Sequence, residues 1–157
     1  MKAPIFKPFL NRCIASITIL SVMLLFTNPV TTNASVSGAR ARADQICRVL
    51  RERGWQVRTN FTSGTLALGQ SAFIRCTFYE GNTYKLVAGG CEDANDVDIA
   101  VYDENGNFID SDQDASSLAV ADFTPKWTGT FTVKVTMYDS TPDGAHFVLQ
   151  YAFRKID

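Results

Sequence analysis

The spacing of hydrophobic residues changes near Trp55, from the period of a helix to the two-residue period of β-strands. Before that point, residues 37–53 are expected to form a helix with one apolar stripe, made of Ala39, Ala43, Ile46, Cys47 and Leu50. Ser37 is a candidate N-cap, and Gly54 stands where a glycine commonly follows the last helical turn. Such a helix needs a surface that covers its stripe.

After Trp55, short runs rich in β-branched and aromatic residues continue to the end of the chain. They cover residues 56–60, 65–68, 72–79, 83–88, 97–102, 108–109, 118–123, 130–137 and 147–153. Turn residues separate the runs, for example Gly81-Asn82 and Asn105-Gly106. Eight or nine strands at this spacing predict an all-β fold, an antiparallel sandwich or barrel with one N-terminal helix.

Alternation within the runs assigns every second side chain to a core between two sheets. The expected inward residues are Ile74, Cys76 and Phe78, then Tyr84, Leu86 and Ala88, then Val97, Ile99 and Val101, and finally Phe131, Val133 and Val135. Only a few residues around Gly81 join runs 72–79 and 83–88. These two runs are therefore expected to pair as a hairpin, with Cys76 opposite about Leu86 or Val87.

The N-terminal residues have the pattern of a secretory signal peptide. Lys2, Lys7 and Arg12 precede an apolar run at 14–26, and small residues follow it at 32–34. Cleavage is expected before Ser35, with Ala39 as the second choice. An uncleaved anchor is the alternative, but the run is short of the roughly 18–20 apolar residues that span a bilayer.

The domain prediction that follows has three parts. Residues 1–34 are a cleaved signal peptide, 35–55 an N-terminal amphipathic basic helix, and 56–157 a β-sandwich. A signal peptide places the processed protein outside the cytoplasm, either periplasmic or secreted. No stable membrane insertion is expected after cleavage.

Composition excludes several classes of protein, and charge divides the rest of the chain. With 157 residues and 15 Lys+Arg against 16 Asp+Glu, the chain is neither disordered nor a basic nucleic-acid binder. Residues 35–64 hold six Arg against Asp44 and Glu52, whereas residues 65–157 hold six Lys+Arg against 14 acids. The basic helix could dock on the acidic strands, which is the favoured interpretation, or meet an anionic surface outside the domain.

Four segments along the strand region carry a family pattern in order. They are Leu66-Ala67-Leu68-Gly69-Gln70-Ser71, Tyr84-Lys85-Leu86-Val87-Ala88-Gly89-Gly90, Asp96-Val97-Asp98-Ile99-Ala100-Val101-Tyr102-Asp103-Glu104-Asn105-Gly106-Asn107 and Thr128-Gly129-Thr130-Phe131-Thr132-Val133-Lys134-Val135. This set, within about residues 62–153, resembles the bacterial pre-peptidase C-terminal domain. The resemblance implies a jelly-roll-like β-sandwich, usually an accessory module beside the catalytic domain of secreted bacterial enzymes. Some members of that family bind calcium or polymeric substrates.

Three cysteines remain after cleavage, so one disulfide and one free thiol are expected in an oxidising compartment. A bridge from Cys76 to Cys91 is awkward within the expected hairpin. Cys47 lies on the apolar face of the helix and Cys91 in a loop, so a Cys47–Cys91 disulfide is predicted to pin the helix to the sandwich. A Cys47–Cys76 bridge is the rival pairing, and Cys76 is otherwise a core thiol.

Acidic residues supply the candidate metal site. Asp110, Asp112 and Asp114 alternate, which places three carboxylates on one side of an extended segment. Asp96 and Asp98 enter another strand, and the family resemblance places both on its acidic strand. Oxygen clusters of this kind favour calcium, the one cofactor that the sequence suggests, although the spacing is not that of an EF-hand. Solvated loop acids are the alternative.

Catalysis finds little support in the sequence. His146, the sole histidine, has no nucleophile-elbow or zinc-binding motif to partner it and is read as a turn-edge residue, so no enzyme is predicted. The predicted function is a non-catalytic binding module for a protein, an envelope component or a polysaccharide. The alternative is an accessory factor, an inhibitor or chaperone-like protein, for a separately encoded secreted hydrolase.

Overall fold

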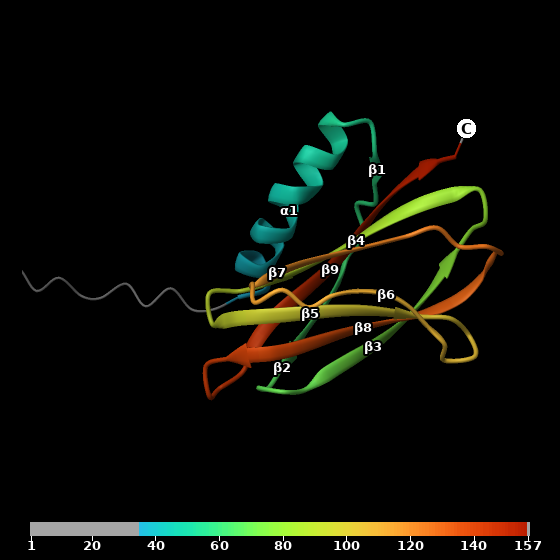
Figure 1. The fold of residues 1–157 in the computed structure, drawn as a ribbon. Coiled ribbons are helices and arrows are strands. Elements are labelled where there is room, and N and C mark those ends of the chain that lie inside the picture. The colour runs from blue at the N-terminus through green and yellow to red at the C-terminus, as the bar shows by residue number, and fades with distance from the viewer. Residues whose placement is uncertain (1–34, 157) are drawn as a thin grey trace, which may run out of the picture. The chain divides into compact units, whose positions relative to one another are not determined.

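The fold of residues 35–156, which are the residues described in this computed structural model, is a two-sheet antiparallel sandwich with one helix (Figure 1). The helix is α1 (Val36–Glu52). The strands are β1 (Gln56–Val57), β2 (Thr62–Leu66), β3 (Ser71–Phe78), β4 (Asn82–Gly90), β5 (Ala94–Tyr102), β6 (Phe108–Asp112), β7 (Leu118–Phe123), β8 (Gly129–Ser140) and β9 (Ala145–Lys155). The predicted fold class is confirmed. The signal-peptide prediction for residues 1–34 lies outside the described residues.

Each sheet draws its strands from distant parts of the chain. The first sheet has the order β1-β9-β4-β7, with β2 also paired to β9, and the second has the order β3-β8-β5-β6. The expected inward residues of β4, β5 and β8 are buried, and Phe78 of β3 is fully buried. Ile74 and Cys76 are only half-buried, because β3 lies at the edge of its sheet.

The expected hairpin between residues 72–79 and 83–88 is wrong. The turn at Gly81, which has a φ of 78°, carries the chain from one sheet to the other, so β3 pairs with β8 while β4 pairs with β7 and β9. Aromatic side chains on both sides of the turn, Phe78 and Tyr84, meet inside the sandwich with ring centroids 4.7 Å apart. The tight turn therefore joins two layers rather than two paired neighbours.

The N-cap of helix α1 lies two residues before the expected one. Ser35, not Ser37, is the N-cap, and its hydroxyl accepts a hydrogen bond from the Gly38 amide at 3.2 Å. At the other end, Gly54 follows the cap residue with a φ of 82°, the left-handed conformation that favours glycine. Ala39, Ala43, Cys47 and Leu50 are buried, which confirms the apolar stripe except for the half-buried Ile46.

The helix packs across the outer face of the first sheet, over β4 and β9 (Figure 1). A Cβ atom on Gly89 would lie 2.7 Å from the carbonyl oxygen of Ala39 and 2.9 Å from the amide nitrogen of Ala43. The helix backbone thus rests directly on β4, and both faces of β4 are covered. This explains why Val87 and Gly89 are buried as completely as the inward residues Leu86 and Ala88.

The helix docks on its own domain, as the favoured interpretation expects, but no ion pair joins it to the acidic strands among residues 35–156. Within residues 35–156, the ion pair of an α1 arginine is the one between Arg40 and Asp44 of the same helix, at 3.5 Å. Arg42 donates to the hydroxyl of Ser117, and Arg48 and Arg51 are exposed. Apolar burial and close backbone approach dock α1, and most of its arginines remain available to solvent.

The predicted Cys47–Cys91 disulfide does not form in the structure, where Cys47, Cys76 and Cys91 are free thiols. The Cys47 thiol lies 3.5 Å from Gln150 Oε1, whereas the amide of Cys91 donates to the carbonyl of His146. The two cysteines thus contact different residues of β9, four positions apart along the strand. Burial, followed by the Asp44 carboxylate, raises the pKa of the Cys47 thiol to about 11.

No helix among residues 35–156 is both long and apolar enough to cross a membrane. The helix that the sequence predicted is amphipathic and packs against a sheet.

Candidate functional site

The alternating acids of β6 close one edge of the sandwich. Asp110 and Asp112 pair with Val101 and Ile99 of β5, so their side chains point inward toward the other sheet. The amide of Asp122 donates to Asp110 Oδ2 at 2.8 Å, and the amide of Val120 donates to Asp112 Oδ2 at 2.7 Å. These carboxylates satisfy exposed N–H groups of edge strand β7, a protection that sandwiches commonly need at their edges.

The remaining candidate metal ligands are distributed around the same end. Asp96 Oδ1 accepts a long hydrogen bond of 3.4 Å from the Ser116 amide, and Asp114 is exposed, its amide donating to Asp112 Oδ1. Burial, then the charges of Asp96 and Asp112, raises the pKa of Asp98, while Lys134 opposes the rise. Among residues 35–156 the structure gathers no group of three or more side chains that could hold a metal ion. Calcium binding at Asp96 and Asp98 stays a prediction.

Replacing Asp98 with asparagine is expected to stabilise the protein at neutral pH. Because its pKa is raised in the folded state, ionised Asp98 opposes folding once the pH exceeds that folded pKa, and it costs nothing below the unfolded value. The Asp98→Asn gain should be at most about 0.5 kcal/mol, since the carboxyl group is partly exposed. It should disappear near pH 3. Thermal melting of both proteins at pH 3 and pH 7 measures this difference.

The same melting experiment tests calcium. A calcium site at these acids would raise the Tm of the native protein in calcium and lower it in chelator, and Asp98→Asn would lose that response. An identical Tm in calcium and chelator would remove the calcium prediction.

His146 is the second residue of β9, a strand that lies between β2 and β4 in the first sheet. Its Nδ1 atom is 2.9 Å from the hydroxyl of Thr65 on β2, and its amide donates to the Cys91 thiol at 3.2 Å. The side chain thus links β9 to β2 in the place that the sequence assigned to a structural histidine.

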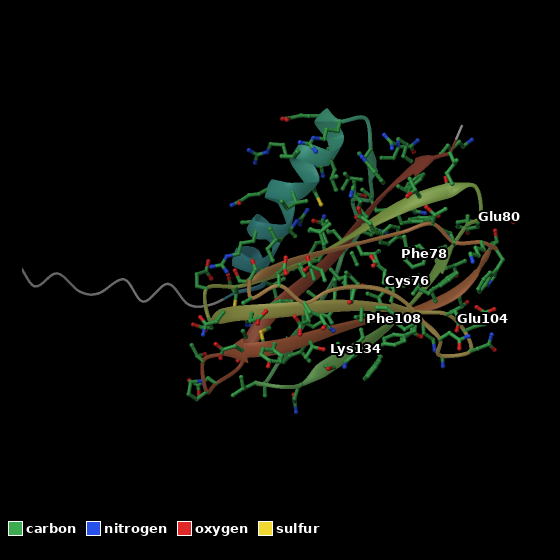
Figure 2. All side chains as sticks on the ribbon, viewed as in Figure 1. Cys76, Phe78, Glu80, Glu104, Phe108 and Lys134 are labelled. Atoms are coloured by element: carbon green, nitrogen blue, oxygen red, sulfur yellow. The ribbon has the colours of Figure 1, made fainter. Side chains whose placement is uncertain are left out.

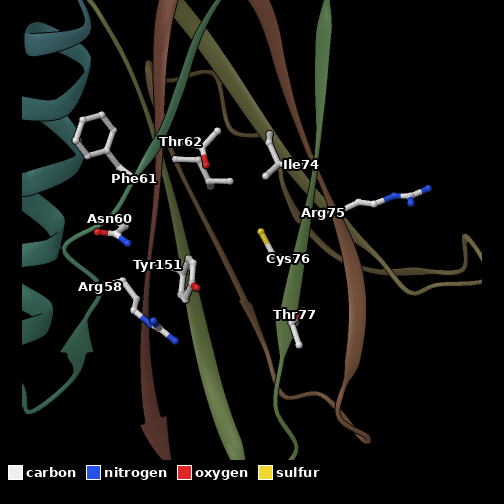
Figure 3. Close-up of a pocket in the computed structure, with 10 residues that line it drawn as sticks. Arg58, Asn60, Phe61, Thr62, Ile74, Arg75, Cys76, Thr77 and Tyr151 are labelled. Carbon is white, nitrogen blue, oxygen red and sulfur yellow. The ribbon is translucent and has the colours of Figure 1, made fainter.

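A groove of about 290 Å³ opens between edge strands β2 and β3, at the end of the second sheet opposite β6. We call it the β2–β3 groove. It is lined by Arg58, Asn60, Phe61, Thr62, Ile74, Arg75, Cys76, Thr77, Leu149 and Tyr151. Figure 3 shows the Cys76 thiol pointing into the groove from β3, with Tyr151 on the facing side, whereas Arg75 points away along the outer side of β3.

The lining of the β2–β3 groove includes Arg58 and Arg75, and no carboxylate among residues 35–156 belongs to it. The Arg58 guanidinium lies 5.7 Å from the centroid of the Tyr151 ring, and the Arg40 guanidinium of α1 lies 4.6 Å from the centroid of Phe61. Within residues 35–156, neither Arg58 nor Arg75 forms a salt bridge. The Arg58 guanidinium is therefore available to an anionic ligand in the groove, and the Arg75 guanidinium is available on the outer side of β3.

The other ionisable groups of the groove stay neutral near pH 7. Burial raises the pKa of the Cys76 thiol, and burial is also the largest cause of the raised pKa of Tyr151, with Arg58 opposing it. The groove interior therefore offers a neutral thiol and a neutral phenol beside a cationic rim. Such a surface suits binding by hydrogen bonds and charge better than nucleophilic chemistry.

The β2–β3 groove was not predicted from the sequence. Alternation assigned Cys76 and Ile74 to the core, and Arg58 and Arg75, 17 positions apart in the chain, carried no predicted role. The signal that could have found it is the basic excess of residues 35–64, since Arg58 belongs to that segment. The edge position of β3 was needed to show that Arg58 and Arg75 flank the same edge of the sandwich, Arg58 at the groove and Arg75 on the outer side of β3.

Several solved structures resemble this fold, whereas searches by sequence find no match. No protein-family model matches the chain, and no curated protein matches it. The fold is similar to the crystal structure of the pre-peptidase C-terminal domain of collagenase from Bacillus anthracis. The two are 15% identical with a TM-score of 0.48, and the match covers 59% of this chain and 87% of that chain. This is the family that the sequence motifs resemble.

Proposed function

We propose that the protein is a non-catalytic binding module that works outside the cytoplasm and takes an anionic partner at the β2–β3 groove. The observation that carries this proposal is the Arg58 guanidinium, which has no salt bridge and lies at an opening that no carboxylate of residues 35–156 lines, with Arg75 likewise unpaired on the outer side of the neighbouring strand β3. The sequence of residues 1–34 supports the location, since it has the pattern of a signal peptide.

Two features support binding rather than catalysis. The groove combines fixed cations with aromatic surface from Phe61 and Tyr151, the composition that dominates interaction sites. Its thiol has a raised pKa, and His146 bonds Thr65 and Cys91 instead of lining the groove.

Capture of the natural partner with a charge-reversed groove tests the function. The full chain is expressed, purified in the processed form that its host yields, immobilised and exposed to an extract of the source organism. Arg58→Glu is expected to reduce retention of the partner by about tenfold or more, because it replaces an attractive charge with a repulsive one. Arg48→Glu, the same change at an exposed helix position, is the matched control and should retain the partner.

The outcomes separate the candidate functions. A secreted hydrolase that the native protein retains and Arg58→Glu does not supports an accessory factor. An envelope polymer with the same behaviour supports an envelope-binding module. Equal retention by the native protein and both variants contradicts the assignment of the groove. Rising salt should weaken a genuine groove complex, since exposed charges carry it.

A further inference from the structure

The edge strands on the two sides of the sandwich differ in whether side chains bond their free backbone groups. At one end, carboxylates of β6 accept hydrogen bonds from backbone N–H groups of β7, which fills the sites that a further strand would use. At the other end, no side chain within residues 35–156 bonds a backbone group of β3. β3 is eight residues long and has β8 as its one neighbour in the sheet. An exposed edge of this length is a template for another strand.

The ladder between β3 and β8 shows which backbone groups are free. The amide of Met137 donates to the carbonyl of Gln70 at 2.9 Å, and Ser71 pairs with Thr136. Since hydrogen-bonded and non-bonded pairs alternate in an antiparallel ladder, the even-numbered residues of β3 bond β8. Phe73, Arg75 and Thr77 therefore direct their N–H and C=O groups to the open edge.

We infer that β3 accepts an extended acidic peptide segment as an additional strand, which seats its inward side chains in the β2–β3 groove. This inference rests on the proposed function and names its partner. A strand beside β3 would place alternate side chains on two faces. Those on the inner face would meet Ile74 and Arg58, and those on the outer face would lie beside Phe73 and Arg75.

The unpaired arginines on both sides of the β3 edge favour an added strand with acidic side chains. Arg58 and Arg75 stand on the two sides of the edge without a carboxylate partner among the described residues, so acidic side chains on either face find a cation. A second copy of this chain is a poor occupant. Antiparallel pairing of two β3 strands at full overlap brings the two Arg75 side chains within about two residues of each other, and like charges at that spacing are destabilising.

A synthetic peptide of nine alternating valine and glutamate residues is the probe. Titrated into the isotopically labelled full chain in its processed form, it should slow amide exchange at Phe73, Arg75 and Thr77, while Ile74 and Cys76 are already bonded to β8. A valine–lysine peptide tests the charge. A valine–glutamate peptide with alternate backbone nitrogens methylated keeps the charge but cannot complete the ladder.

We expect Arg75→Glu and backbone methylation of the peptide each to weaken binding about tenfold, and Arg48→Glu to change it less than about twofold. The Arg75→Glu protein should remain folded, because Arg75 is exposed, and circular-dichroism melting is the control that tests this.

Three results overturn the inference. If the acidic peptide binds through Arg58 but leaves the exchange of the three edge amides unchanged, strand addition is wrong while the proposed function stands. If the lysine peptide binds as well as the acidic one, or neither binds, the acidic partner is wrong, and the capture experiment judges the function separately. If the edge amides become protected without peptide as protein concentration rises, a second copy occupies β3.

Discussion

Replacing Phe78 with alanine is expected to lower the free energy of unfolding by about 3–5 kcal/mol, the range for a large aromatic side chain removed from a core. Phe78 is fully buried at the end of β3, where Figure 2 labels it. Its ring centroid lies 4.9 Å from that of Phe123, 5.6 Å from Tyr151 and 5.8 Å from Phe131. These rings come from three other strands of both sheets, so the deletion loosens the contact between the layers.

Denaturant unfolding followed by circular dichroism measures this loss. Phe108→Ala removes the same atoms from an exposed position, where 60% of the side chain is accessible, and should cost less than about 1 kcal/mol. Phe78→Leu keeps most of the volume and is expected to cost about 1.5 kcal/mol or less. Equal losses for Phe78→Ala and Phe108→Ala would show that Phe78 does not hold the sheets together.

Replacing Gly89 with valine is expected to lower the free energy of unfolding by about 2–3 kcal/mol and to loosen α1 from the sheet. Even the first added carbon would lie 2.7 Å from Ala39 O and 2.9 Å from Ala43 N. Both are backbone atoms of a helix, so the helix must move as a body. For a domain of this size the Tm should fall by about 8–12 °C.

Gly38→Ala is the matched control in the same helix. Its added carbon would meet the Glu92 carboxylate at 2.5 Å, but Glu92 is exposed and its side chain can turn away. Alanine also favours the helix by up to about 1 kcal/mol relative to glycine. Gly38→Ala should therefore be neutral or stabilising. Hydrogen exchange of the α1 amides should accelerate in Gly89→Val alone, and unchanged exchange there would mean that the helix tolerates the added side chain.

Local patterns were sufficient to find the elements of this fold. The helix and all nine strands were expected at nearly the positions observed, because hydrophobic periodicity and turn residues act over a few neighbours. The Asp103–Asn107 turn is one case, where the Asn107 side chain donates to Asp103 Oδ2 and the amides of Asn105 and Asn107 donate to Oδ1. The side-chain bond is the main cause of the lowered pKa of Asp103, and the backbone bonds add to it. Strand boundaries were less certain at β2, which begins three residues before the predicted run.

The sites depended on pairings that no local pattern contains. Alternation at Asp110 and Asp112 correctly placed both carboxylates on one face of the strand. What that face contacts depended on the position of β7 in the other sheet, whose amides donate to both carboxylates. The disulfide prediction placed Cys47 correctly on the buried face of the helix, but the direction in which α1 crosses β9 separates it from Cys91.

The sequence by itself determined one amphipathic helix, nine strands, their buried faces and the charge difference between residues 35–64 and 65–157, since each follows from residues close together in the chain. Only the tertiary structure decided that β3 and β4 belong to different sheets, that β3 lies at an open edge, and that Arg58 and Arg75 flank this edge on its two sides. The physical reason is that strand pairing is chosen by the total burial and hydrogen bonding of the whole sandwich, to which residues far apart in sequence contribute together.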